Sequence, residues 1–189
     1  MKALHLVLVH HPVLDRDGGI VTTAITNLDL HDMSRSGRTY DAVHLWVVHP
    51  ITAQRTLAER IRAHWVEGSG GKRIPDRARA LAILRIVPSL EDVFHGIGGE
   101  AGRAGLQVWT TAASSAKHGE LTSWPAARAQ LAGATRPVAL LFGTGWGLAP
   151  EVLRDADVRI APIDGAPGSD FDRLSVRAAC AIALDRLRG

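Results

Sequence analysis

Short apolar runs alternate along the chain with stretches in which apolar residues recur at helical spacing. The runs predict six strands, over residues 1–9, 42–49, 81–87, 106–110, 138–142 and 158–160. Helices are predicted over residues 26–40, 52–65 and 174–187, and others are predicted to begin near residues 89, 123 and 148. Strands that alternate with helices form βαβ units around a parallel sheet. No repeat or linker divides the sequence, so we expect residues 1–189 to form a single α/β domain.

The first predicted helix has a clear N-terminal signal. Thr26 or Asn27 is a suitable N-cap, and Asp29 follows where negative charge is stabilised by the helix dipole. Further along, Arg35 and Arg38 are three residues apart and therefore project together. From spacing alone, a solvated face is the simpler interpretation of this pair.

The connector at residues 68–73 is rich in glycine and basic residues. It is not a Walker loop, because Val66 stands where that motif requires its first glycine. We expect a flexible, solvated connector, with contact between Lys72 or Arg73 and an RNA backbone as the alternative.

One connection between a strand and a helix differs from the others. The strand predicted at residues 138–142 leads into Gly143, Gly145 and Gly147, and a helical pattern begins at Leu148. Glycine in regular structure costs roughly 0.5–1 kcal/mol relative to alanine, and one glycine is enough for a tight turn. Three glycines favour a loop that admits a ligand to the main chain, with a plain strand-to-helix turn as the alternative.

Two more loops of small residues occur in the last part of the chain, at residues 111–115 and 162–168. Ligands of parallel sheets bind beyond the carboxyl ends of the strands, so these loops and the glycine loop are expected to surround one site. Such walls suit a small ligand held by backbone amides and carbonyls. An adenine nucleoside fits that description.

The composition is that of an ordinary globular protein. The 189 residues are 46% hydrophobic and 22% charged, and a domain of this size buries roughly 70% of the surface that its unfolded chain exposes. The formal net charge of +3 favours a phosphate-bearing partner only weakly.

Cysteine usage and the first residues predict the cellular environment. Cys180 is the single cysteine, which excludes an internal disulfide, fits a reducing compartment and is expected to pack inside a helix. The apolar run at residues 4–9 is too short to span a bilayer and lacks the flanks of a signal peptide, so we expect a cytoplasmic protein without membrane contact. His10 and His11 are adjacent, but no second Cys/His pair lies at ligand spacing, so no metal is expected.

Two common kinds of site fit the sequence poorly. A dinucleotide-binding fold needs further strand-helix units after its glycine motif, and only about forty residues follow Gly147. The Gly-x-Ser-x-Gly elbow of the hydrolases does not occur. The glycines at residues 96–99 follow a helical stretch rather than a strand, so they do not form a dinucleotide fingerprint.

Several segments resemble a known family. The C-terminal ones are Phe142-Gly-Thr-Gly-Trp-Gly-Leu148, Ala161-Pro-Ile-Asp164 and Leu174-Ser-Val-Arg-Ala-Ala179. They are similar to the two C-terminal motifs of the SPOUT superfamily of S-adenosylmethionine (SAM)-dependent RNA methyltransferases. Residues 22–32 and 35–40 resemble a small subfamily of single-domain SPOUT proteins, and the resemblance extends from the first strand to the last helix.

The resemblance implies a parallel-sheet α/β domain whose C-terminal chain forms a deep trefoil knot, a rare exception to unknotted topology. It also implies a homodimer, in which the partner completes each site, and SAM as the cofactor. The cofactor-binding residues that it implies are Thr111, Ala112, Phe142, Gly143, Thr144, Gly145, Gly147, Ile160, Pro162, Leu174, Ser175 and Val176.

The resemblance also implies roles in methyl transfer to RNA. Arg35 matches the arginine that ribose-methylating relatives place near the target. Asn27 approximates their asparagine, with a spacing to Arg35 that is two residues longer here. Ser175, at the start of the last helix, is expected to orient the acceptor. The expected contacts to RNA phosphates come from Arg35, Arg38, Lys72, Arg73 and Arg177.

Other functions remain open at this point. Many relatives carry a glutamate in the central glycine motif, where this chain has Gly145 and Trp146, and no general base is obvious. The alternative to a methyltransferase acting on the ribose or base of tRNA or rRNA is therefore a SAM- or RNA-binding module without catalysis, and a dinucleotide oxidoreductase ranks third. Trp146 is interpreted either as a core residue or as an aromatic platform beside adenine or a target base.

Overall fold

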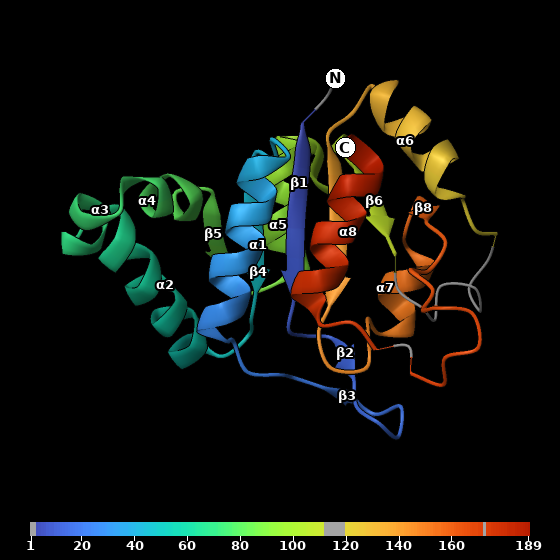
Figure 1. The fold of residues 1–189 in the computed structure, drawn as a ribbon, viewed down its shortest axis with the longest axis horizontal. Coiled ribbons are helices and arrows are strands. Elements are labelled where there is room, and N and C mark those ends of the chain that lie inside the picture. Colours follow the sequence, from blue (N-terminus) through green and yellow to red (C-terminus); the bar gives the residue numbers. More distant parts are fainter. Residues whose placement is uncertain (1–2, 112–119, 172) are drawn as a thin grey trace.

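A computed structural model describes residues 3–111, 120–171 and 173–189 of the chain. Its centre is a six-stranded sheet in the order β5-β4-β1-β7-β6-β8 (Figure 1). Every pairing in this sheet is parallel, which confirms the predicted α/β class. The strands are β1 (Leu4–Val9), β4 (His44–Val48), β5 (Leu84–Val87), β6 (Gln107–Thr110), β7 (Val138–Gly143) and β8 (Val158–Arg159).

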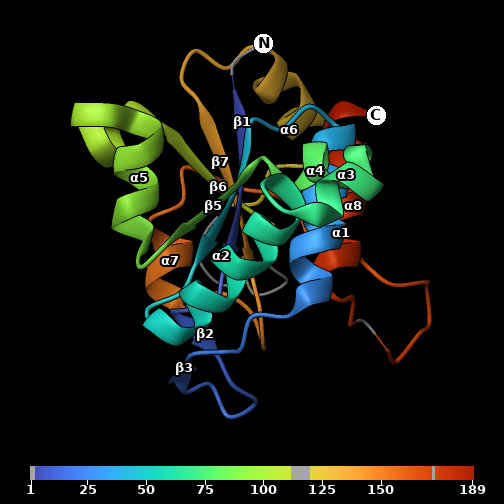
Figure 2. The same cartoon turned by 90° about the vertical axis from the view of Figure 1, so that its left-hand side faces the viewer.

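Helices cover both faces of the sheet. Figure 2 shows α5 and α7 on one side and α1 and α8 on the other. The helices are α1 (Asn27–Thr39), α2 (Thr52–Val66), α3 (Ser69–Arg73), α4 (Pro75–Leu81), α5 (Leu90–Gly98), α6 (Trp124–Ala132), α7 (Pro150–Arg154) and α8 (Val176–Arg188), with a 3-10 helix η1 (Gly99–Gly105) after α5.

The two faces of β1 explain its unbroken apolar run. Leu6 and Leu8 pack in the cluster that contains core residues of α1 and α8. Val7 and Val9 pack in the second cluster, with residues of α5 and α7. A parallel strand that is buried on both faces needs apolar residues at every position. Cys180 is fully buried in α8, as predicted, and burial raises the pKa of its thiol to about 12.

The predicted helix starts are confirmed where a local cap exists. Thr26 is the N-cap of α1, and its hydroxyl accepts a hydrogen bond from the backbone N–H of Asp29. Ser89, Ser123 and Ser175 cap α5, α6 and α8 in the same way. Each of these caps satisfies a backbone donor that the helix leaves unpaired.

The predicted flexible connector at residues 68–73 is wrong, because Ser69–Arg73 forms the short helix α3. An added Cβ at Gly70 would lie 2.8 Å from the ring of Trp65, so close packing on α2 holds this segment. The strand predicted from residue 81 begins only at Leu84, since Leu81 ends the unpredicted helix α4. Helices this short depend on tertiary packing, which local patterns do not reveal.

The segment after β1 contains a small antiparallel hairpin of β2 (Val13–Leu14) and β3 (Ile20–Val21), which the sequence analysis does not predict. Val13 also forms an isolated bridge to Leu148, just after the glycine loop. The hairpin therefore lies beside the glycine loop, at the carboxyl end of the sheet (Figure 1).

Candidate functional site

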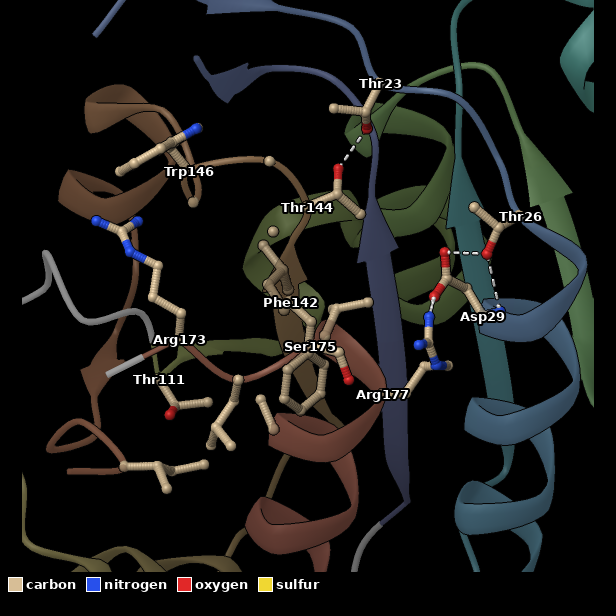
Figure 3. Close-up of a pocket in the computed structure, with 18 of the residues that line it drawn as sticks. Thr23, Thr26, Asp29, Thr111, Phe142, Thr144, Trp146, Arg173, Ser175 and Arg177 are labelled. Atoms are coloured by element: carbon tan, nitrogen blue, oxygen red, sulfur yellow. Dashed lines mark hydrogen bonds and ion pairs between the residues drawn. The ribbon is translucent and has the colours of Figure 1, made fainter. Parts of the chain in front are cut away.

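A cavity of about 510 Å³ lies at the carboxyl ends of the central strands (Figure 3). Its walls come from residues far apart in the sequence: the segment before α1, the end of β6, the glycine loop after β7, and the segment that leads into α8. The position agrees with the expected site of a ligand in a parallel sheet.

The glycine loop is fixed by hydrogen bonds of its own main chain. The N–H of Trp146 donates to the carbonyl of Leu14 over 2.9 Å, and the N–H of Leu14 donates to the carbonyl of Gly147 over 2.9 Å. Gly145 has a φ of +58°, and a Cβ there would lie 2.7 Å from the Leu14 carbonyl oxygen. Gly147 has a φ of +110° and open space where a Cβ would be. Gly145 is therefore required by packing against the hairpin, whereas Gly147 leaves the main chain accessible.

A partly buried polar network supports the loop from behind. The hydroxyl of Thr144 donates to the carbonyl of Val9 and contacts the hydroxyl of Thr23. Thr23 in turn hydrogen-bonds with Nδ1 of His10 over 2.9 Å, and its carbonyl lies 2.9 Å from Nε2 of His49. Burial, followed by the charge of His49, lowers the pKa of His10 to about 4, so this imidazole is neutral near pH 7. The network fixes the two threonines that face the cavity.

An ion pair between α1 and α8 forms the opposite wall (Figure 3). Asp29 is only 5% exposed, and its Oδ1 accepts a hydrogen bond from Nη1 of Arg177 over 2.7 Å. Its Oδ2 accepts from the hydroxyl of Thr26 over 2.6 Å. Arg177 also lies 3.5 Å from Asp32. Charge-assisted bonds of this kind fix a guanidinium in one orientation.

The predicted cofactor residues are largely brought together. The lining includes Thr111, Phe142, Gly143, Thr144, Gly145, Gly147, Leu174, Ser175 and Val176. Ile160 and Pro162 are not in the lining: Ile160 is fully buried in the core, and the carbonyl of Pro162 accepts a hydrogen bond from Nε1 of Trp124. The neighbouring Ile163 lines the cavity instead. Ala112 lies outside the described residues.

Of the three residues predicted to act in catalysis, one lines the cavity and two do not. Ser175 lines the cavity, and its hydroxyl caps α8 by accepting from the N–H of Ala178 over 3.2 Å. Arg35 is exposed on α1 and does not line the cavity, although it shares an adjoining hollow with Ser175 and Arg177. Asn27 is exposed as the first residue of α1 and lines neither space.

The predicted RNA-binding residues lie in two regions. Arg35 and Arg38 are exposed on α1, which packs against α8 beside the cavity. Lys72 and Arg73 are exposed on α3, at the edge of the molecule beyond α2 (Figure 1). Arg177 belongs to the ion pair described above.

Sequence reasoning missed several residues of the cavity wall. These are Thr23, Ala24, Thr26, Asp29, Leu141, Ile163, Arg173 and Ala179. From the sequence, Asp29 is recognisable only as a residue that favours the helix dipole, because its partner Arg177 lies 148 positions away. The acidic residue in the first turn of α1 was the one local signal that pointed to this wall.

Within the described ranges, no group of three or more His, Cys, Asp or Glu side chains could hold a metal ion. No helix in that part of the chain is long and apolar enough to cross a membrane.

Comparison with known proteins gives a consistent result. Residues 3–189 match a family model described as SAM-dependent RNA methyltransferase. The chain is 41% identical over 188 residues to a tRNA (guanine-N(1)-)-methyltransferase of Nitratidesulfovibrio vulgaris, a match that covers all of this chain and 42% of that protein. It is 35% identical over 182 residues to an uncharacterized protein of Aquifex aeolicus, covering 96% of this chain and 86% of that protein.

The fold is also found among solved structures. The TrmH/SpoU tRNA modifying enzyme of A. aeolicus matches all of this chain and 75% of its own, with a TM-score of 0.55 and 15% identity. At this identity the likeness concerns the fold, and it agrees with the expected SPOUT architecture.

Proposed function

The chain belongs to the family of SAM-dependent RNA methyltransferases, and from this premise we propose that it transfers a methyl group from SAM to RNA. The observation that carries the proposal is the cavity at the carboxyl end of the sheet. The open main chain of the glycine loop forms part of one wall, and the partly buried Asp29–Arg177 pair forms part of another. A small cofactor and a phosphate-bearing substrate are the ligands that such walls suit.

The residues of the cavity fit the cofactor. Its volume lies within the roughly 300–1,000 Å³ of small-molecule sites. Phe142, Leu174 and Val176 supply apolar walls for an adenine ring. The hydroxyl of Thr111 is buried without a hydrogen-bond partner among the described residues, so it is available to a polar group of a ligand. When bound, SAM supplies a methyl group on a positively charged sulfur.

We propose that Asp29 positions Arg177. Both of its carboxylate oxygens already accept hydrogen bonds, from Arg177 and from Thr26. Arg177 in turn faces both the cavity and the adjoining hollow, where it can hold an RNA phosphate. Arg35 lies in that hollow and is proposed to contact the RNA next to the acceptor. Holding donor and acceptor in register is the main task of an enzyme whose cofactor is intrinsically reactive.

The substrate class and the assembly are further proposals. The relative from N. vulgaris is named for tRNA, so tRNA is the first RNA to test. This chain spans 42% of that protein's length, and the acceptor atom is therefore to be identified by experiment. We also propose a homodimer, a C-terminal trefoil knot and a cytoplasmic location. The last fits the buried, free Cys180 and an RNA substrate.

The test uses RNA from cells that lack the gene, incubated with the protein and methyl-labelled SAM. We expect label in tRNA, and digestion to nucleosides then identifies the acceptor. Arg35→Ala and Arg177→Ala are expected to lower the single-turnover rate by at least about tenfold, which corresponds to roughly 1.4 kcal/mol. Arg128→Ala is the control, because Arg128 is exposed on α6 and lines neither the cavity nor the adjoining hollow.

The outcomes separate the hypotheses. Calorimetric binding of SAM without label in any RNA pool would contradict methyl transfer and favour a non-catalytic module. A rate that survives Arg35→Ala unchanged would remove the role proposed for that residue.

A further inference from the structure

Trp146 is a large aromatic side chain in an unusual position. It is 46% exposed, whereas Trp46 and Trp109 are at most 7% exposed. Exposed apolar residues are common, but a half-exposed tryptophan at the wall of a cavity is an informative exception. The interpretation of Trp146 as a core residue is therefore wrong, and its interpretation as an aromatic platform remains.

The backbone that carries this indole is fixed on both sides. The N–H of Trp146 donates to the carbonyl of Leu14, and the carbonyl of Gly147 accepts from the N–H of Leu14. The flanking Gly145 is held against the same carbonyl of Leu14. A ring projected from a fixed backbone loses little conformational entropy when a ligand stacks on it.

A planar cation already lies on this ring. The guanidinium carbon of Arg173 is 3.8 Å from the centroid of the Trp146 ring. In the described part of the chain, no carboxylate lies within 4 Å of Arg173. Among the described residues, the ring is therefore the contact that holds this guanidinium, and the same face can accept another planar group.

The placement of the ring separates it from the rest of the site. Figure 3 shows Trp146 and Arg173 on one side of the cavity and the Asp29–Arg177 pair on the other, with Phe142 and Ser175 between them. In the proposed function, the adenine of the cofactor lies against other residues of the lining, Phe142, Leu174 and Val176. The exposed indole thus provides a second aromatic surface, next to a cation that can move to a phosphate.

We infer that Trp146 stacks on one unpaired base of the RNA, in the place on the indole that Arg173 occupies in the free protein. The inference rests on the proposed function for its RNA. Single-stranded loops of RNA present unstacked bases that proteins bind on aromatic rings. A base inside a continuous helix could not reach this face, so the substrate region is a loop or an unpaired end.

The experiment compares wild type with Trp146→Leu and Trp146→Phe. The probes are tRNA and single-stranded RNA oligonucleotides that carry the fluorescent base 2-aminopurine. We expect wild type to quench 2-aminopurine, and we expect Trp146→Leu to bind RNA roughly 5- to 100-fold more weakly and to lose this quenching. Trp146→Phe should retain part of both. The control is Val43→Ala, an apolar residue of similar exposure (43%) just before β4, at the amino end of the sheet, which should bind as wild type does.

Calorimetry with SAM alone distinguishes the two groups that could stack on Trp146, the adenine of SAM and a base of the RNA. We expect Trp146→Leu to bind SAM as tightly as wild type. An equal loss of affinity for SAM and RNA would overturn the inference, because the ring would then support the cofactor. Quenching that persists in Trp146→Leu would overturn the inference as well. So would a tryptophan fluorescence that changes on protein dilution but not on RNA addition and that loses this change in Trp146→Leu, because the ring would then contact a second copy of the chain.

The inference and the proposed function fail in different ways. If wild type and Trp146→Leu methylate and bind RNA equally, the inference fails and the function stands. If Trp146 quenches the 2-aminopurine fluorescence of bound RNA but no RNA receives label from SAM, the proposed function fails and the base-stacking site stands.

Discussion

His10 and His5 are buried histidines that lie just beyond and within β1. Burial, followed by the charge of a neighbouring histidine, lowers the pKa of each from 6.5 to about 4. The neighbours are His44 for His5 and His49 for His10, and Asp29 acts on His10 in the opposite direction. Nε2 of His10 has no hydrogen-bond partner among the described residues, so a proton there would create an unpaired buried charge.

These shifts predict acid sensitivity. The folded pKa lies below the unfolded one, so the unfolded chain binds more protons between pH 6.5 and 4. The free energy of unfolding should therefore be fully retained above pH 6.5 and fall as pH decreases, by roughly 3 kcal/mol per histidine near pH 4. Urea unfolding from pH 7.5 to 4.5 measures this. His10→Asn should show a shallower decrease, and the exposed control His95→Asn should follow wild type.

A decrease that is equally steep in His10→Asn and in wild type would show that other groups carry the acid sensitivity. The neutral His10 would then matter only for the position of Thr23.

Among the elements, the glycine loop shows what a sequence pattern can and cannot predict. The number of glycines indicated a special loop, and the structure places it on the cavity. The reason for Gly145, close contact with the Leu14 carbonyl, depends on a hairpin that the sequence pattern did not reveal. Strands and capped helices were predictable because their signals lie within a few residues. α3, the hairpin and the Asp29–Arg177 pair depend on partners distant in sequence.

Gly145→Ala should therefore destabilise the loop. The left-handed φ costs roughly 1–2 kcal/mol for alanine, and the contact with the Leu14 oxygen adds to this cost. We expect a lower free energy of unfolding in urea and weaker SAM binding in calorimetry. Gly133→Ala is the matched control, because Gly133 has a φ of −91° and its Cβ would approach nothing closer than 3.7 Å. If both variants behave alike, the loop does not need its observed shape.

The link between α1 and α8 gives a second prediction at this scale. Asp29→Asn leaves Arg177 without its main partner and should lower the free energy of unfolding by about 1–3 kcal/mol. Asp32→Asn should cost less than about 1 kcal/mol, since the Asp32 side chain is 47% exposed. A double-mutant cycle with Arg177→Gln isolates the coupling energy. A coupling near zero would mean that the pair does not position Arg177.

At the scale of the whole molecule, the net charge of +3 does not say where RNA lies. Apart from Arg177 on α8, the predicted RNA-binding cations form a pair on α1, beside the cavity, and a pair on α3, at the edge of the molecule (Figure 1). Arg35 shares a hollow with Arg177 and Ser175, which connects the α1 pair to the site. Nothing in the described residues connects the α3 pair to the cavity in this way.

The salt dependence of RNA binding distinguishes the two pairs. Each phosphate contact that is lost should reduce the slope of log K against log salt by about 0.7 for a single strand. Arg35→Gln with Arg38→Gln should therefore reduce the slope by about 1.4, whereas Lys72→Gln with Arg73→Gln should leave it unchanged. Each double variant removes two positive charges, so the two variants have the same net charge. A reduced slope for the α3 variant alone would place the RNA across α2 and α3, away from the cavity. It would contradict our proposal that the RNA contacts both α1 and Trp146.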